Sequence, residues 1–210
     1  MYEWFEVYRN AEQLARAWGP IDYLYPHLKG ARFKKGERVG VVVHDGKEGL
    51  RYGHMTLCFK PDLKNKYGDD KIYEEDLLTG KALQPFFKKH RCLVPVDSWV
   101  FKHKAREGAG DFSFHPSSPA PMCFGGVYST FLHGNGTRIN TVAIIGIASG
   151  GYYGKFCAKV PGLFLPGPEA IDFCNPKVSE TKAWELLRRF PEEGMTVSKY
   201  EMIAQPPEYE

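Results

Sequence analysis

Four segments of the chain are dominated by β-branched, aromatic and other apolar residues and are bounded by Gly, Pro or Asn, a pattern typical of β-strands. They cover residues 39–44 (VGVVVH), 91–101 (RCLVPVDSWVF), 122–128 (MCFGGVY) and 140–148 (NTVAIIGIA). Several of them are apolar without the period-two alternation of a strand that has one face in water, which indicates that both faces are covered. The chain is therefore predicted to build its fold around strands buried on both sides.

Helical signals are fewer than strand signals. Residues 10–18 carry Ala and Leu at helical spacing behind a candidate Asn10 cap, and residues 179–190 begin with a candidate Ser179 cap and end before Pro191. The segments 60–68 and 102–121 are polar and rich in Gly, Pro and Lys, which predicts surface loops. Together these signals predict a mixed α/β fold that is rich in β-structure.

Composition limits the class of protein. With 210 residues, of which 43% are hydrophobic, the chain can bury a sizeable core, and we expect a single domain over residues 1–210. It shows no signal-peptide pattern and no run of 18 apolar residues, so we expect a soluble cytoplasmic protein without membrane contact. The net charge of +3 and the pI of about 8.5 are mildly basic, so charge alone does not predict nucleic-acid binding.

The five cysteines do not form a metal-binding pattern. They stand 17 to 34 residues apart and include no C-x-x-C pair, whereas structural zinc sites usually bring ligands two to four residues apart. Cys92 and Cys123 lie inside apolar runs, where a free cysteine behaves as a small buried hydrophobic residue. We therefore expect neither a metal ion nor another cofactor.

Residues 91–97 read R-C-L-V-P-V-D, and the chain opens with M-Y-E-W-F. The first segment resembles the R-C-L-[VI]-P-A-D strand of the SRAP family, the SOS response-associated peptidases, and the second stands where that family has M-C-G-R-[FY]. The resemblance implies a curved, partly closed β-barrel-like sheet with peripheral helices. It also implies an ancestry among proteins that bind single-stranded DNA and trap abasic sites covalently.

The same resemblance fails at the catalytic positions. At the spacing of the family motifs, Tyr2, Lys71, Phe101 and Cys157 stand where the family has its catalytic Cys, Asn, Glu and His. The family chemistry needs a thiolate, a free amine and acid-base groups that titrate near neutrality. A phenol with an ordinary pKa of about 10 and a phenylalanine cannot supply these groups. The sequence therefore predicts a divergent member with no catalytic residues, not an enzyme of the family type.

Two basic clusters and one aromatic loop are candidate nucleic-acid contacts. Single-strand binding combines cations that hold phosphates with rings that stack on bases. The clusters surround Phe33 and follow Phe86-Phe87, and the loop precedes Cys157. The candidate residues are Arg32, Lys34, Lys35, Lys88, Lys89, Arg91, Tyr152 and Tyr153. The competing interpretation is that the charges are ordinary solvated surface and the rings belong to the core.

Three functions remain open at this point. The first is non-covalent binding of single-stranded or overhang DNA in an SOS, DNA-damage or phage context, which the basic clusters favour. The second is a protein-binding or regulatory factor that reuses the fold, which Trp4 and the loss of the family's Asn and Arg at Lys71 and Tyr73 favour. The third and least supported is a cysteine hydrolase that uses Cys157 as its nucleophile.

Overall fold

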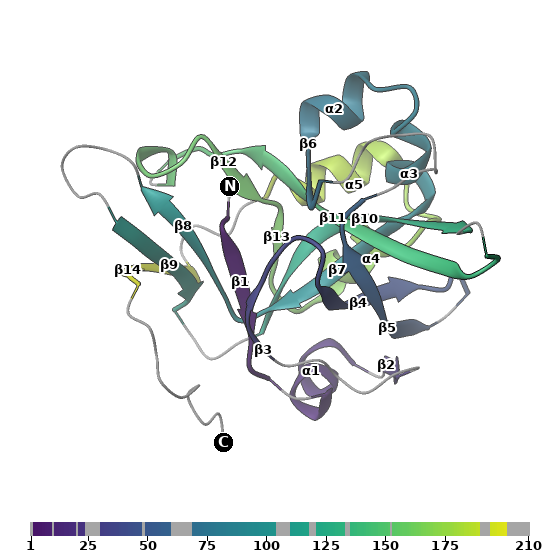
Figure 1. Cartoon of the computed structure of the whole chain (residues 1–210), viewed down its shortest axis with the longest axis horizontal. Coiled ribbons are helices and arrows are strands. Elements are labelled where there is room, and N and C mark those ends of the chain that lie inside the picture. Colours follow the sequence, from purple (N-terminus) through teal and green to yellow (C-terminus); the bar gives the residue numbers. More distant parts are fainter. Residues whose placement is uncertain are drawn as a thin grey trace.

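The computed structural model describes residues 2–9, 11–19, 21–23, 30–47, 49–59, 69–103, 110–117, 121–132, 135–151, 153–189 and 194–200. Strands dominate these residues (Figure 1). The elements in chain order are β1 Trp4–Val7, α1 Ala11–Trp18, β2 Ile21–Tyr23, β3 Gly30–Phe33, β4 Arg38–His44, β5 Leu50–Leu57, β6 Lys71–Tyr73, α2 Glu74–Thr79, α3 Gln84–Lys89, β7 Arg91–Val96, β8 Ser98–His103, β9 Gly110–Pro116, β10 Met122–Leu132, β11 Arg138–Ala148, η1 Tyr153–Lys155, β12 Lys159–Pro161, β13 Leu163–Phe164, α4 Pro168–Cys174, α5 Glu180–Leu187 and β14 Met195–Lys199.

The larger sheet closes into a barrel. Its strands run in the order β12-β11-β10-β7-β4-β5-β2, and a parallel pairing of β11 with β5, with Thr141 opposite Thr56, joins the two ends of the central five strands. Closure removes the unpaired edges that an open sheet would expose. The prediction of a mixed, β-rich fold with a barrel-like sheet is confirmed, and the ring of β11, β10, β7, β4 and β5 is fully closed.

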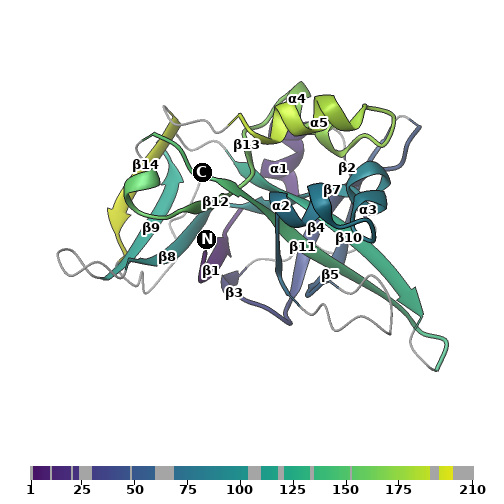
Figure 2. The same cartoon turned by 90° about the horizontal axis from the view of Figure 1, so that it is seen from above.

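A second sheet of five strands lies beside the barrel, in the order β14-β9-β8-β1-β3 (Figures 1 and 2). The chain passes from the barrel into this sheet at Asp97, so the single strand predicted over residues 91–101 is in fact two strands, β7 and β8. Asp97 accepts hydrogen bonds from the backbone N–H groups of Tyr8 at 2.5 Å and Arg9 at 3.0 Å and forms an ion pair with the Arg9 side chain. These bonds fix the corner between the sheets.

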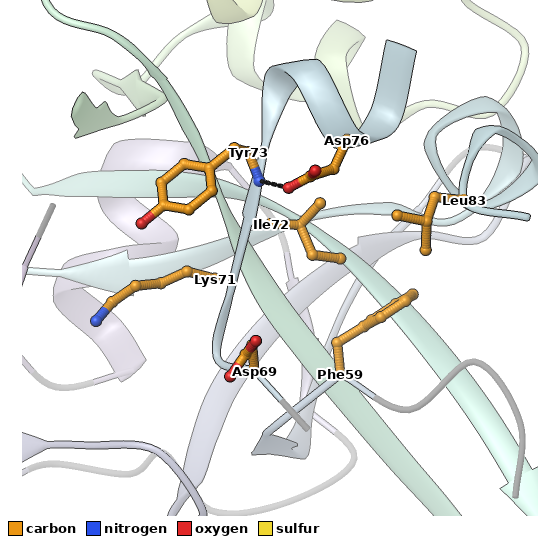
Figure 3. Close-up of a pocket in the computed structure, with 7 residues that line it drawn as sticks. All are labelled: Phe59, Asp69, Lys71, Ile72, Tyr73, Asp76 and Leu83. Atoms are coloured by element: carbon orange, nitrogen blue, oxygen red, sulfur yellow. Dashed lines mark hydrogen bonds between the residues drawn. The ribbon is translucent and has the colours of Figure 1, made fainter. Parts of the chain in front are cut away.

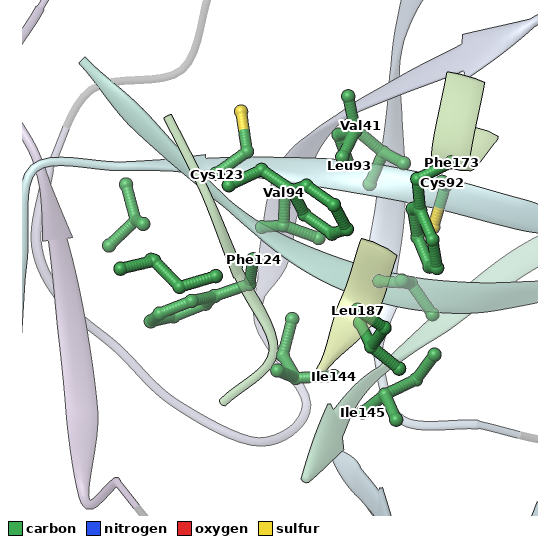
Figure 4. Close-up of a cluster of buried hydrophobic side chains, with 14 of the residues drawn as sticks. Val41, Cys92, Leu93, Val94, Cys123, Phe124, Ile144, Ile145, Phe173 and Leu187 are labelled. Carbon is green, nitrogen blue, oxygen red and sulfur yellow. The ribbon is translucent and has the colours of Figure 1, made fainter. Parts of the chain in front are cut away.

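The barrel strands are buried on both faces, as the sequence predicted. All six residues of β7 are buried. Figure 4 shows Leu93 and Val94 of this strand among side chains from neighbouring strands, with Phe173 and Leu187 arriving from α4 and α5. A Cβ atom added at Gly125 of β10 would lie 2.7 Å from the Leu187 side chain, so this glycine is what allows α5 to approach the sheet closely.

The remaining predictions about local structure divide into two groups. The helices predicted over residues 10–18 and 179–190 are confirmed as α1 and α5, and the Ser179 hydroxyl caps α5 by accepting from the Lys182 N–H at 3.3 Å. The loop predicted over residues 102–121 is wrong in part, because it contains β9. Polar composition hid this strand, whose Phe114 ring stacks on Trp99 at 4.9 Å. The loop predicted over residues 60–68 lies outside the described residues.

Among the helices that the structure describes, none is long and apolar enough to span a bilayer.

Arg91 is buried at the start of β7, which corrects its assignment as a phosphate contact. Every N–H of its guanidinium donates to a backbone carbonyl. The acceptors lie 2.5 to 3.0 Å away and belong to Phe87, Lys88, Phe173, Asn175 and Val178. Because the fork of five donors is saturated, the side chain has no N–H left for a ligand. Its role is to tie the ends of α3 and α4 and the turn that follows α4 to the barrel.

Replacing Arg91 with Met should destabilise the fold strongly. The substitution keeps much of the apolar stem but leaves five carbonyls without their donor, and a buried acceptor without a partner costs about 1–3 kcal/mol. We expect a loss of at least about 3 kcal/mol in the free energy of unfolding, measured by urea denaturation. The exposed neighbour Lys89, replaced with Met, is the matched control and should change the same quantity by less than about 0.5 kcal/mol.

Candidate functional site

Tyr2 is buried in the core rather than presented to a ligand. Its side chain is 1% exposed, and its ring stacks on Phe124 at 5.8 Å and meets the Phe5 ring edge-on at 5.8 Å. Its hydroxyl donates to the Asp70 carboxylate at 3.0 Å. Burial, and then the negative charge of Asp70, hold the pKa of Tyr2 well above its ordinary value of 10.0. The phenol therefore stays neutral and acts as a hydrogen-bond donor, not as a nucleophile.

Lys71 lies directly beside Tyr2. Its Nζ atom is 4.4 Å from the centre of the Tyr2 ring and 3.6 Å from an Asp70 carboxylate oxygen. The backbone of β6 also borders a small cavity of about 90 Å³ (Figure 3). The lining residues are Phe59, Asp69, Lys71, Ile72, Tyr73, Asp76 and Leu83. Figure 3 shows the Lys71 ammonium and the Tyr73 hydroxyl extending to the same side, away from Leu83, while the Asp76 carboxylate lies between Tyr73 and Leu83.

Phe101 and Cys157 are linked through one aromatic ring. Phe101 is buried on β8, and its ring lies 6.0 Å from that of Phe156, the residue before Cys157. Burial raises the pKa of the Cys157 thiol above its ordinary value of 9.0. Such a thiol is protonated at neutral pH, whereas a catalytic cysteine needs a lowered pKa. His90, a histidine that could serve as a base in a cysteine hydrolase, instead packs against the Phe86 and Tyr128 rings.

The four positions that the family resemblance marks as catalytic therefore come together as two contacts. Tyr2 touches Lys71, and Phe101 reaches Cys157 through Phe156. The pairing of β1 with β8 joins the two contacts, since the Glu3 N–H donates to the Val100 carbonyl at 2.7 Å. In the residues that the structure describes, no group of three His, Cys, Asp or Glu side chains is placed to hold a metal ion.

The predicted nucleic-acid contacts differ in how far they are exposed to solvent. Tyr153 is buried and packs against Phe114 at 5.1 Å, so its assignment as an exposed stacking ring is wrong, while Tyr152 lies outside the described residues. The clustering of aromatic residues with glycines in the sequence did not indicate that the Tyr153 ring would be buried.

Two of the four predicted lysines already have acidic partners. Lys35 pairs with Asp69 at 2.9 Å, and Lys88 lies 3.6 Å from Glu180, both at exposed positions. Lys89 is exposed beside Lys88. Exposed pairs of this kind are weak and screened by salt, so a phosphate can replace the carboxylate at small cost. The surface around Lys88 is nevertheless less positive than its sequence indicates.

Arg32 and Lys34 converge on an aromatic ring that the sequence did not mark as their partner. The Arg32 guanidinium lies 5.3 Å and the Lys34 ammonium 5.6 Å from the centre of the Trp4 ring, and the Tyr200 ring meets Trp4 edge-on at 5.4 Å. Trp4 is half-buried. We call Trp4, Arg32 and Lys34 the Trp4 cluster. Two cations within 6 Å of an indole are the combination that binds nucleic-acid strands and other anionic aromatic ligands.

The position of Arg32 depends on a bulge in β3. Between the pairs Phe5–Phe33 and Val7–Gly30, β3 carries one residue more than β1. Arg32 takes φ of 70°, and it is the one non-glycine residue of the described set with a positive φ. That conformation costs roughly 1–2 kcal/mol. Bulges redirect side chains and are frequent beside functional sites.

The comparison with known families agrees with this architecture. The sequence model of the SOS response associated peptidase (SRAP) family matches residues 5–202, and the chain belongs to that family. No curated protein matches the chain.

Solved structures share the fold at low sequence identity. A protein from Bordetella bronchiseptica is 11% identical with a TM-score of 0.78, covering 94% of this chain and 99% of that one. A protein from Bacteroides thetaiotaomicron is 13% identical with a TM-score of 0.74, covering 94% and 92%. A phage-related protein from Bordetella bronchiseptica is 16% identical with a TM-score of 0.75, covering 95% and 94%. These likenesses establish the fold and leave the site to be judged on its own residues.

The raised pKa of Tyr2 predicts a specific pH dependence. A tyrosine whose pKa is higher in the folded state stabilises the fold fully below its unfolded pKa of about 10, and this contribution is lost as pH rises above that value. Tyr2→Phe should therefore be less stable than the wild type at pH 7, by about 1–2 kcal/mol for the lost hydrogen bond to Asp70. The difference should narrow between pH 10 and 11. Urea denaturation across this range measures it, and a constant difference would contradict the assignment.

Proposed function

We propose that this protein binds single-stranded DNA without forming a covalent bond to it, and that it has lost the covalent chemistry of its family. The environment of Tyr2 is the observation that supports the loss of covalent chemistry. The residue that stands in the place of the nucleophilic cysteine is buried, neutral and committed to Asp70. An intracellular role in DNA damage or phage biology is the setting we propose, and one structural relative is described as phage-related.

The Trp4 cluster supports the DNA half of the proposal. Proteins that bind single strands without sequence preference combine cations along the backbone with rings that stack on bases, and each stacked base contributes about 1–3 kcal/mol. Trp4 stands two residues from Tyr2 on β1, and Arg32 and Lys34 approach it from β3 and the turn after β3. Two cations and an aromatic ring therefore lie close to Tyr2, which stands where the family has its reactive cysteine.

We expect no stable adduct with DNA that contains an abasic site. The nearest side-chain groups are the neutral phenol of Tyr2 and the Lys71 ammonium held beside Asp70, and neither reproduces a thiolate with an adjacent amine. Incubation with an abasic oligonucleotide followed by denaturing electrophoresis measures this directly. A shifted band in the wild-type lane would overturn the loss of chemistry, and an active member of the family serves as positive control.

DNA binding should depend on salt in proportion to the phosphates contacted. If about four phosphates are neutralised, the logarithm of the affinity should fall with the logarithm of salt concentration at a slope near −3 for a single strand. Replacing Arg32 and Lys34 with Ala should make the slope shallower by about 1.4, since each lost contact removes about 0.7. Fluorescence anisotropy with a labelled oligonucleotide gives the slope.

The control for this experiment is Lys177→Ala, an exposed lysine that follows α4. This variant should keep the wild-type slope. A binding curve that responds neither to salt nor to the loss of Arg32 and Lys34 would exclude the DNA proposal.

A protein partner is the second candidate function, and one exposed apolar side chain favours it. Leu132 is 57% exposed at the end of β10, next to the half-buried Phe131. Single exposed leucines are common on protein surfaces, so this observation is weaker than the Trp4 cluster. An affinity that is lost in Leu132→Ser and is indifferent to salt would favour the protein partner.

A further inference from the structure

We propose that a base of the bound strand stacks on Trp4 in the place that the Tyr200 ring now holds, so that Tyr200 competes with DNA for this surface. The inference rests on the proposed function, because it names where the single strand binds and what controls access to it. The competitor is part of the chain itself, and its contacts with β1 and β3 define the surface that the strand would take over.

Tyr200 is held to the Trp4 cluster by three kinds of contact. Its ring meets Trp4 edge-on, and its hydroxyl donates to the buried carboxylate of Glu6 at 3.0 Å. Arg32 donates a hydrogen bond to the same hydroxyl. Tyr200 therefore uses both the ring and the cation that a nucleotide would use, and the two ligands cannot occupy the cluster together.

Release of Tyr200 leaves the rest of the fold intact. The Glu6 carboxylate keeps its hydrogen bond from the Ser98 hydroxyl at 2.6 Å, so it is not left bare. β14 is the edge strand of the smaller sheet and pairs with β9, outside the closed barrel (Figure 2). Edge strands with solvent-exposed residues open at lower free energy than central ones. Tyr200 and the edge strand β14 can therefore move away from Trp4 without unfolding the barrel.

We call the arrangement with Tyr200 packed on Trp4 the closed state. In this state the indole N–H of Trp4 is not satisfied. The Nε1 atom of Trp4 is buried and has no hydrogen-bond partner among the described residues. An indole N–H is a donor only, and burying it unpaired is unfavourable. A DNA strand offers acceptors at every phosphate and at most base edges. The orphan donor, together with the strained Arg32 that points at the same ring, indicates a surface built for a ligand other than Tyr200.

Substitutions at position 200 test the competition. In anisotropy titrations with labelled oligothymidylate at fixed salt, Tyr200→Ala should bind about tenfold more tightly than the wild type. The reason is that the strand no longer has to displace the Tyr200 ring from Trp4. Tyr200→Phe keeps the ring and loses the bond to Glu6, and it should tighten binding by about threefold. Thr196→Ala, at an exposed position of β14 four residues before Tyr200, is the matched control and should leave the affinity unchanged.

Trp4→Ala, added to Tyr200→Ala, should remove the gain and show that the uncovered ring is what binds. Wild-type binding that is equal to or tighter than that of Tyr200→Ala would overturn the competition and leave the proposed function standing. Absence of binding by the wild type and every variant would overturn both.

Hydrogen exchange gives a test that does not depend on the stability of a variant. The Tyr200 N–H donates to the Asp111 carbonyl at 2.8 Å in the closed state. Saturating oligothymidylate should increase the exchange rate of this amide in the wild-type protein if the strand displaces the segment. Slower exchange on binding would mean that Tyr200 is part of the DNA site, which contradicts the competition.

Discussion

The guanidinium of Arg91 holds the architecture together. A single buried cation gives all five of its N–H groups to carbonyls near the ends of α3 and α4, and it stands at the first residue of the central barrel strand β7. At the other end of β7, the Asp97 carboxylate accepts hydrogen bonds from the backbone N–H groups of Tyr8 and Arg9. One strand with a charge at each end thereby fixes helices, barrel and second sheet relative to one another, since a buried charge is tolerated only where its hydrogen bonds are complete.

The same rigid frame accommodates large aromatic side chains at two of the positions that the family resemblance marks as catalytic. The positions that carry chemistry in the family lie beside the core, so aromatic residues can be absorbed there. Tyr2 stacks on Phe124 and Phe101 packs near Phe114, and each adds buried apolar area where the family has polar groups. Close to Tyr2 in sequence, the half-buried Trp4 ring is combined with the cations of Arg32 and Lys34.

Much of the fold was predictable from local sequence. Apolar runs without alternation predicted strands buried on both faces, and the R-C-L-V-P-V-D segment identified the family to which the chain belongs. The helices α1 and α5 followed from helical spacing and a cap at Ser179. These features succeed because periodicity and capping depend on neighbours within one element. The strand β9 was missed for the converse reason, since Phe112 and Phe114 stand inside a polar stretch and their contacts are with the neighbouring strand β8, which pairs with β9.

The sequence by itself determined the family and the strand-rich class, because these depend on residue identity and on local pattern. Tertiary structure alone decided which charged side chains are buried and which face solvent. Lys88, Lys89 and Arg91 look alike as a basic run, yet Arg91 begins a central strand and is enclosed by carbonyls while Lys89 faces solvent. Trp4 and Tyr200 stand at opposite ends of the chain, and only the pairing of β1, β8, β9 and β14 in one sheet brings them into contact. Burial and long-range contact are properties of packing, and no local pattern encodes them.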